Sequence, residues 1–358
     1  MENMAKIAIV CVVVVVIIVA VVVLLFLGKG SQIGVVTTTI SQAGASVINY
    51  IYCVGTSSTA QENQVFYASI LSNGQLGQWQ QTTSYPTQFS FAGCSIYGGY
   101  IYCTGAFKSS APYNLTYYAP ISGKGIGQWN ATTPYIISMY RAGCSAYNGY
   151  LYCVGSQTGA MSETYFAPIS STGIGNWSSS RDYPEMGHSI GCSVYNGTIY
   201  CIGVGNYPFN HVYYANVSSS GFGPWHQTAN YPVPMIDAGC SVNNGYIYCV
   251  GTGGTRGQNQ TYYAPLTAKG ISNWISTTPY PVQFSKDGCS IANNYIYCVG
   301  SSQQENQQLV YYAPISSSGI GAWLEGTKYP VAMNSAYCQI PGLGGGYYGG
   351  GGPSSGPA

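Results

Sequence analysis

A chain of 358 residues with 5% charged residues and a formal net charge of +1 departs from ordinary soluble domains, in which about a quarter of the residues are charged. The charge balance excludes the basic footprint of a nucleic-acid-binding protein, and 46% hydrophobic residues exclude disorder driven by high charge. Neutral polar residues and 36 tyrosines carry the polarity instead. This composition fits an acidic medium, where protonated carboxylates contribute little, and it fits equally well compositional drift in a glycosylated surface protein.

The first expected element is an uncharged, proline-free run at residues 7–27, IAIVCVVVVVIIVAVVVLLFL. A helix over this run would be about 31 Å long, which matches the hydrocarbon core of a bilayer. A cleaved signal peptide is the alternative, but its apolar region is shorter and ends in a small-residue pattern that GKGSQIG lacks. We expect a retained transmembrane helix at 7–27, with residues 1–6 in the cytoplasm and residues 28–44 as an extracellular linker.

Residues 45–341 consist of a repeated unit that reads YIYCVG, a variable loop, YYAPISSSGIGxW, TTxYP and AGCSxYNG. Its tryptophan recurs at intervals of 48 to 50 residues, at Trp79, Trp129, Trp177, Trp225, Trp274 and Trp323. Self-similarity at a fixed period is the signature of a repeat architecture. The sequence therefore predicts six equivalent units.

Within a unit, a two-residue turn separates two short runs, as in CSIYGGYIYC at 94–103. Gly-Gly and Asn-Gly favour two-residue hairpins because both central residues need positive φ. With Gly98 and Gly99 as the turn, Cys94 faces Cys103 at a non-hydrogen-bonded pair, where Cα atoms approach to about 4.5 Å. That separation suits a disulfide. Five such stapled hairpins are expected: Cys94–Cys103, Cys144–Cys153, Cys192–Cys201, Cys240–Cys249 and Cys289–Cys298.

Two cysteines of the repeat region remain, Cys53 and Cys338. The first unit has Ala45 where its leading cysteine should stand, and the last segment, NSAYCQI, matches half a hairpin with nothing after it. We therefore expect the last segment to complete the first unit through a Cys53–Cys338 disulfide. Since each sheet has bulky residues on both faces, a ring of sheets covers them all. The expected fold is all-β, a six-bladed β-propeller closed by strands from both ends of the chain.

Six disulfides require an oxidising compartment, so the ring is expected outside the cell. A metal-binding role for these cysteines is disfavoured because they face each other strand to strand and do not form C-x2-C knuckles. Glycosylation sequons agree with an external location. They lie at Asn114, Asn130, Asn176, Asn196, Asn216 and Asn259. In a chain rich in Asn, Ser and Thr several arise by chance, and we expect about half to be used.

The pattern RAGCSAYNGYLYCVG, a loop, ETYFAPISSTGIGNW and then YP resembles the kelch repeat over about residues 45 to 340. The resemblance implies a propeller that binds proteins or glycans and in some members carries catalysis. The chain departs from that pattern, since CVGS or CTGA replaces the Gly-Gly doublet, the arginine survives only at Arg141, and cysteine pairs are added. The variant YYAPISSSGIGAW is similar to kelch-like surface proteins of archaea and bacteria. Fold alone does not give function.

Enzymes of this architecture need catalytic residues at equivalent positions of several repeats, and this sequence does not have them there. A copper oxidase site of the galactose oxidase type needs two histidines and a free cysteine, and a sialidase-like site needs three arginines around the axis. The three histidines and three arginines occupy non-equivalent repeat positions, and we expect the histidines to be solvated. These residues are His188, His211, His226, Arg141, Arg181 and Arg256.

Asp237 and Asp287 lie near strand starts in adjacent repeats, as do Arg141 and Lys286. A carboxylate pair there is conceivable for glycoside chemistry, but rim residues in weak ion pairs are the preferred interpretation. We therefore expect no catalytic residue, no metal and no cofactor.

The variable loops follow YIYCVG in every unit and should emerge on one face. They cover 55–64, 106–115, 155–163, 204–211, 252–260 and 301–309. Loop aromatics beside Asn, Ser and Gly make adaptable contacts, so the expected ligand-face residues are Tyr113, Tyr207, Phe209, Tyr231 and Arg256. A merely solvated loop face is the alternative. The tail at 342–358, GLGGGYYGGGGPSSGPA, is low complexity and expected to be disordered.

The sequence thus favours a single-pass membrane protein of a prokaryotic, archaeal-type envelope, whose extracellular propeller binds a cell-surface protein or glycan or acts as an envelope scaffold. An extracellular glycan-active enzyme on the same ring is the second hypothesis. A pilus-like or virion surface subunit is the third, ranked lower because MAKIAIV lacks the cleavage context of archaeal pilins. The residues leave the oligomeric state open.

Overall fold

The computed structural model describes the repeat region with gaps. The described residues are 46–54, 63–87, 93–108, 111–139, 143–155, 162–186, 190–203, 209–235, 239–252, 258–284, 288–300, 307–332 and 337–341. All belong to the second of two compact units, Ala45–Ala358. The transmembrane helix expected at 7–27, the linker at 28–44 and the tail at 342–358 lie outside them. Within the described ranges, no helix has the length and hydropathy needed to span a membrane.

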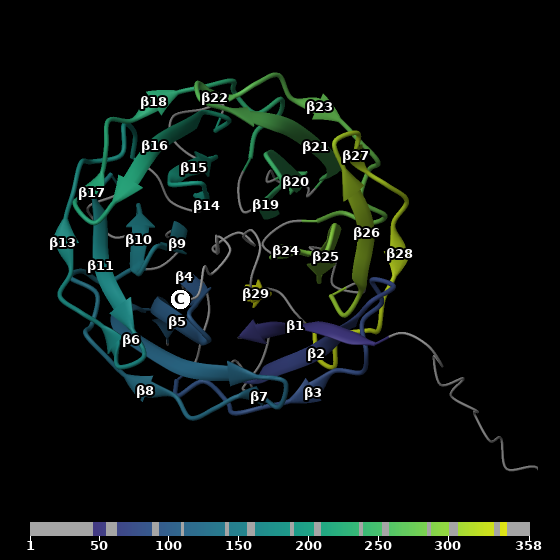
Figure 1. Cartoon of the computed structure of the whole chain (residues 1–358), viewed down its shortest axis with the longest axis horizontal. Coiled ribbons are helices and arrows are strands. Elements are labelled where there is room, and N and C mark those ends of the chain that lie inside the picture. The colour runs from purple at the N-terminus through teal and green to yellow at the C-terminus, as the bar shows by residue number, and fades with distance from the viewer. Residues whose placement is uncertain are drawn as a thin grey trace, which may run out of the picture. The chain divides into compact units, whose positions relative to one another are not determined.

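Six antiparallel sheets form a ring, so the six-bladed propeller is confirmed (Figure 1). Blade 1 has the strand order β29-β1-β2-β3, and blades 2 to 6 follow in chain order, each with a five-stranded sheet. The innermost strands are β29 (Tyr337–Gln339), β4 (Gly93–Tyr97), β9 (Gly143–Tyr147), β14 (Gly191–Tyr195), β19 (Gly239–Asn243) and β24 (Cys289–Ala292). The second strands are β1 (Val47–Val54), β5 (Tyr100–Lys108), β10 (Tyr150–Val154), β15 (Thr198–Ile202), β20 (Tyr246–Thr252) and β25 (Tyr295–Val299).

In blades 2 to 6 the third strand is longer than the second and carries two short outer strands, whereas the third strand of blade 1 carries one. The third strands are β2 (Val65–Leu71), β6 (Ala111–Ser122), β11 (Thr164–Ser170), β16 (Val212–Ser218), β21 (Gln258–Thr267) and β26 (Val310–Ser316). One outer set is β7 (Gly125–Ile126), β12 (Gly173–Ile174), β17 (Gly221–Phe222), β22 (Gly270–Ile271) and β27 (Gly319–Ile320). The other is β3 (Gln80–Gln81), β8 (Asn130–Ala131), β13 (Ser178–Ser179), β18 (His226–Gln227), β23 (Ile275–Ser276) and β28 (Leu324–Glu325).

The stapled hairpins form with the predicted register. Cys94 faces Cys103 and Tyr97 faces Tyr100, and the other four hairpins repeat this pairing. Both turn residues have positive φ, as at Asn148 (46°) and Gly149 (79°). All six predicted disulfides are present, with Cα atoms 4.0 to 4.3 Å apart. Every bonded cysteine is buried.

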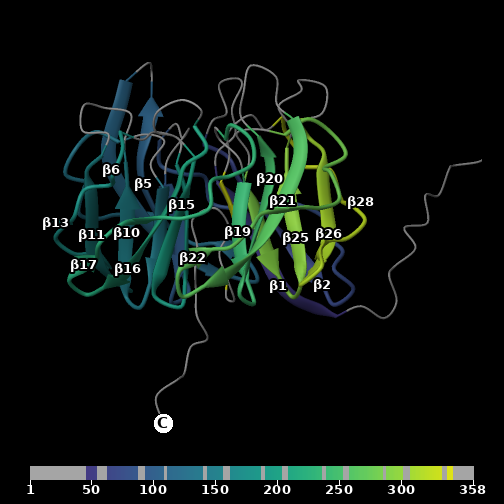
Figure 2. The ribbon, with the colours of Figure 1, turned by 90° about the horizontal axis from the view of Figure 1, so that it is seen from above.

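The ring closes as predicted, because β29 pairs antiparallel with β1 and Cys338 faces Cys53. Asn49 Nδ2 also donates to the Pro341 carbonyl at 2.8 Å. The chain therefore enters and leaves the ring at one end, which we name the turn face because it also carries the hairpin turns at 98–99, 148–149, 196–197, 244–245 and 293–294. The second strands run from that end to the opposite one, which we name the loop face (Figure 2).

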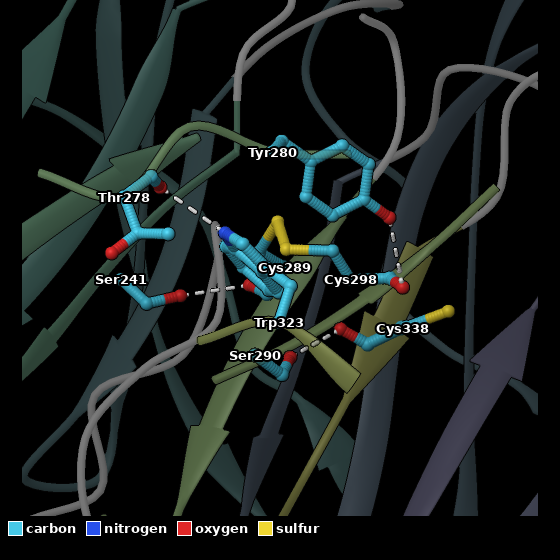
Figure 3. Close-up of a disulfide and its surroundings, with 8 residues drawn as sticks. All are labelled: Ser241, Thr278, Tyr280, Cys289, Ser290, Cys298, Trp323 and Cys338. Carbon is cyan, nitrogen blue, oxygen red and sulfur yellow. Dashed lines mark hydrogen bonds between the residues drawn. A yellow bond between two sulfur atoms is a disulfide. The ribbon is translucent and has the colours of Figure 1, made fainter. Parts of the chain in front are cut away.

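Each interface between blades repeats one set of contacts. Every core cluster combines the disulfide of one blade with tyrosines of the preceding blade, so both sheet faces are covered. At the interface of blades 5 and 6 (Figure 3), Trp323 Nε1 donates to the Thr278 carbonyl at 3.1 Å. The Trp323 ring stands edge-on to Tyr280 with centroids 4.9 Å apart. Nearer the axis, Ser241 Oγ donates to the Cys289 carbonyl at 2.7 Å.

Candidate functional site: the loop face

The five residues predicted to form a ligand surface have three different outcomes. Tyr207 and Arg256 lie outside the described residues. Tyr113 is half-buried against the core of blades 1 and 2, and its hydroxyl lies 2.6 Å from the Thr87 hydroxyl. Phe209 has a φ of 60° and packs against the core of blade 4. Tyr113 and Phe209 thus pack against the core and are partly exposed at the loop face.

Tyr231 corrects the sequence-based prediction, because its side chain has 0% exposure. It stands edge-on to Trp274 and Tyr262, with ring centroids 4.9 and 5.3 Å apart. The same place is taken in the other blades by Tyr85, Tyr135, Tyr183, Tyr280 and Tyr329. Tyr231 is therefore a core residue of the TTxYP motif and does not contribute to a binding surface.

One polar cluster interrupts this repeated core, at the entry to blade 4. His211 Nδ1 lies 2.7 Å from Glu185 Oε1, and the Tyr213 hydroxyl donates to the same oxygen at 2.8 Å. The side chains of His211 and Glu185 are 25% and 12% exposed. The neighbouring Met186 is 64% exposed. A carboxylate that accepts from a phenol and contacts an imidazole fixes the orientation of that ring at the edge of the loop face.

The cluster arises where the chain crosses from blade 3 to blade 4. Glu185 follows Tyr183 and Pro184, and the equivalent positions of the other crossings carry Thr87, Ile137, Val233, Val282 and Val331. Sequence reasoning missed the contact and assigned His211 to solvent. The available signal was a carboxylate at a position that is aliphatic in four of the six copies. His226 lies apart, exposed on β18, and His188 lies outside the described residues.

Blade 3 has a related contact, in which the Tyr165 hydroxyl donates to Glu163. Burial, reinforced by the hydrogen bond and the charge of the carboxylate, raises the pKa of Tyr165 and of Tyr213 to about 12. Both glutamates thus accept from a phenol that keeps its proton throughout the physiological range. The two hydrogen bonds therefore hold the carboxylates of Glu163 and Glu185 in place.

The raised tyrosine pKa values predict alkaline instability. Unfolded tyrosines ionise near pH 10, so these tyrosines contribute no pH dependence below that value. Stability should then fall as the pH rises from 10 through 12, because the unfolded chain releases protons that the folded ring retains. Urea unfolding of the 45–341 fragment at a series of pH values, with phenolate absorbance as the second probe, measures this. The pH dependence should weaken in the Tyr165→Phe/Tyr213→Phe variant, and unchanged stability of the parent up to pH 12 contradicts the prediction.

The predicted catalytic and metal-binding possibilities fall mostly beyond the described part of the chain. Asp237, Asp287, Arg141 and Lys286 all lie in segments outside it. In the described ranges, no group of three or more His, Cys, Asp or Glu side chains is arranged to hold a metal ion. What the described loop face offers is an oriented imidazole, two held carboxylates and exposed apolar atoms, which suit hydrogen bonding and packing against a ligand.

The glycosylation sequons separate into two groups. Asn114 is half-buried, and its Nδ2 donates to the Tyr135 carbonyl at 2.9 Å, as the equivalent Asn63 and Asn210 do in their blades. The other five asparagines are exposed: Asn130, Asn176, Asn196, Asn216 and Asn259. The amide nitrogen of Asn114 thus has a structural partner, which argues against a glycan there.

No protein-family model matches this chain, and a search of curated protein sequences finds no match.

Proposed function

We propose that the protein is a membrane-anchored, kelch-like propeller of a prokaryotic envelope that binds a cell-surface protein or a glycan through its loop face. Six disulfides support the extracellular location, because such bonds form and persist in oxidising compartments. The apolar run at 7–27 supports a single-pass anchor.

The observation that carries the proposal is the separation of constant and variable parts between the two faces. Chain entry and exit, near Asn49 and Pro341, lie at the turn face. The segments that differ most between repeats follow the second strands at the loop face. A rigid scaffold that presents variable connections at one end is the usual arrangement of a recognition surface.

Contacts around Glu185 and His211 support a more specific placement of the proposed binding surface. A polar pair beside exposed Met186 combines directional hydrogen bonds with apolar area. Binding sites commonly combine apolar surface with a few placed polar groups of this kind. We therefore place the centre of the binding surface at blades 3 and 4.

A fragment covering 45–341 tests the proposal, since all six core clusters and all six disulfides lie within it. The labelled fragment should bind intact cells or particular glycans on an array. The variants His211→Ala and Glu185→Gln should weaken that binding by about tenfold, or roughly 1.4 kcal/mol.

The matched control is Lys124→Ala, which changes an exposed charge in the β6–β7 turn on the turn face. This variant should bind as the parent does. A fragment that binds neither cells nor glycans contradicts the proposed function, and equal loss of binding in the control and the loop-face variants contradicts the placement of the surface.

A further inference from the structure

Blade 4 departs from the repeat at two positions that face each other. The residue after the hairpin turn is tyrosine in the other four hairpins, as is the equivalent Tyr50 of blade 1, but it is Thr198 in blade 4. The residue opposite it on the third strand is proline in four blades, serine in blade 1 and Asn216 in blade 4. Thr198 and Asn216 are cross-strand partners, as Tyr150 and Pro168 are in blade 3.

Both departures complete an N-x-[ST] sequon, at Asn196-Gly-Thr198 and at Asn216-Val-Ser218. Each sequon takes its other polar residue from the repeat, since asparagine is common at the hairpin turn and serine ends the third strand in most blades. Two departures from the repeat at one place therefore give two sequons within one corner of the turn face.

Three of the four other sequons contain hydroxyl groups that the fold itself uses. Thr116 is buried and lies 2.8 Å from the Thr104 hydroxyl. Thr261 is buried and donates to the Thr278 carbonyl at 2.7 Å. Thr132 accepts from the Ile174 amide at 2.8 Å, across the interface of blades 2 and 3. The threonines of the sequons at Asn114, Asn259 and Asn130 thus have structural roles that explain their presence. Ser178 of the Asn176 sequon differs, because it is exposed at a position that varies between the repeats.

The corner in blade 4 is also more open than its equivalents. In blade 3, a Cβ built on Gly175 would lie 2.8 Å from the ring of Pro168. In blade 4, the nearest atom to a Cβ built on Gly223 would be the Asn216 carbonyl oxygen at 3.4 Å, and the Asn216 side chain would lie 3.8 Å away. Asn196 and Asn216 are both exposed, and Thr198 Oγ1 donates to Asn216 Oδ1 at 3.1 Å. With Thr198 and Asn216 in place of tyrosine and proline, this corner carries two exposed amide groups and has more room beside Asn216.

We propose that this corner of blade 4 is an N-glycosylation site, with a glycan on Asn196, on Asn216 or on both. In the reaction, the amide nitrogen Nδ2 bonds to the anomeric carbon of a lipid-phosphate-linked glycan. The bond from that carbon to the phosphate oxygen breaks, Nδ2 gives up one proton to the transferase, and the lipid phosphate leaves. The glycan projects from the turn face and leaves the loop face uncovered. The proposal does not depend on the identity of any loop-face ligand.

Mass spectrometry of the full-length protein from the cells that naturally make it tests this site. Trypsin releases residues 182–256 as one peptide, because no lysine or arginine interrupts it, and the peptide contains these two sequons only. After reduction, its mass should exceed the sequence mass by one or two glycans, and fragmentation should locate them on Asn196 or Asn216.

Variants made in the same cells separate modification from a structural role of the Thr198–Asn216 hydrogen bond. Thr198→Val removes the first sequon, Ser218→Ala removes the second, and the double variant should carry no glycan. Thr198→Ser keeps both the sequon and the hydroxyl and should remain modified. The variant Thr198→Tyr/Asn216→Pro restores the pair found in blade 3 and should fold and be unmodified.

An unmodified 182–256 peptide in the exported parent protein overturns the proposal, wherever else glycans are found. So does a mass increment that persists in the double variant, because it would then reside on another residue.

Discussion

Replacing Cys53 and Cys338 by alanine should lower the free energy of unfolding by about 5–6 kcal/mol, whereas replacing Cys144 and Cys153 should lower it by about 3 kcal/mol. The two bridges have nearly the same local geometry, but the first joins residues separated by 285 positions and the second by 9. Because a longer loop restricts the unfolded chain more, ring closure is the stronger constraint. Denaturant unfolding of the 45–341 fragment measures both changes.

Peptide mapping without reduction provides the control, because it shows whether the remaining five bridges form in each variant. Equal destabilisation by the two double variants contradicts the expected dominance of closure. The finding of Cys53 and Cys338 as free thiols in exported parent protein also contradicts it. If the closure variant does not reach a fully closed ring, limited proteolysis should show cleavage that begins in blade 1, since its strands β1 and β29 then lose their covalent link.

Gly173→Ala should lower the free energy of unfolding by roughly 3 kcal/mol, through strain of about 1–2 kcal/mol and overpacking of about 1–3 kcal/mol. Gly173 has a φ of 116°, and an added Cβ would lie 2.3 Å from Thr132 Oγ1 of the preceding blade. That threonine also accepts from the Ile174 amide, so it cannot move away without loss of a hydrogen bond. Thermal or urea unfolding of the fragment measures the effect.

Gly149→Ala is the matched control. Gly149 has a φ of 79°, and an added Cβ would have no neighbour within 4 Å. This variant should show the backbone strain alone, about 1–2 kcal/mol. If both variants cost the same, contact between the blades does not explain why glycine occupies the GIG position.

The hairpin turns and the cysteine pairing could be predicted because each depends on residues within a short segment of the sequence. The turns need residues that tolerate positive φ, and Gly98-Gly99 or Asn148-Gly149 supply them. Counting outward from the turn then places Cys94 opposite Cys103. Ring closure followed from Cys53 and Cys338, because each half-motif lacked its other half.

The burial of individual aromatic residues could not be predicted so well. Tyr231 looked like a loop residue because proline follows it and polar residues surround it. Its burial depends on Trp274 and Tyr262, which come from the next blade. Position in a repeat was the better guide than local composition, since all six equivalent tyrosines are buried.

The sequence by itself determined the number of blades, the hairpin register and the pairing of all twelve cysteines in the ring, because repeated motifs and turn geometry act over a few residues. Only the tertiary structure decided which side chains meet between blades. The contact of Glu185 with His211 and the confinement of Asn114 by the Tyr135 carbonyl each join residues more than 20 positions apart. Such contacts depend on how one sheet lies on the next, and that packing has no local signature in the chain.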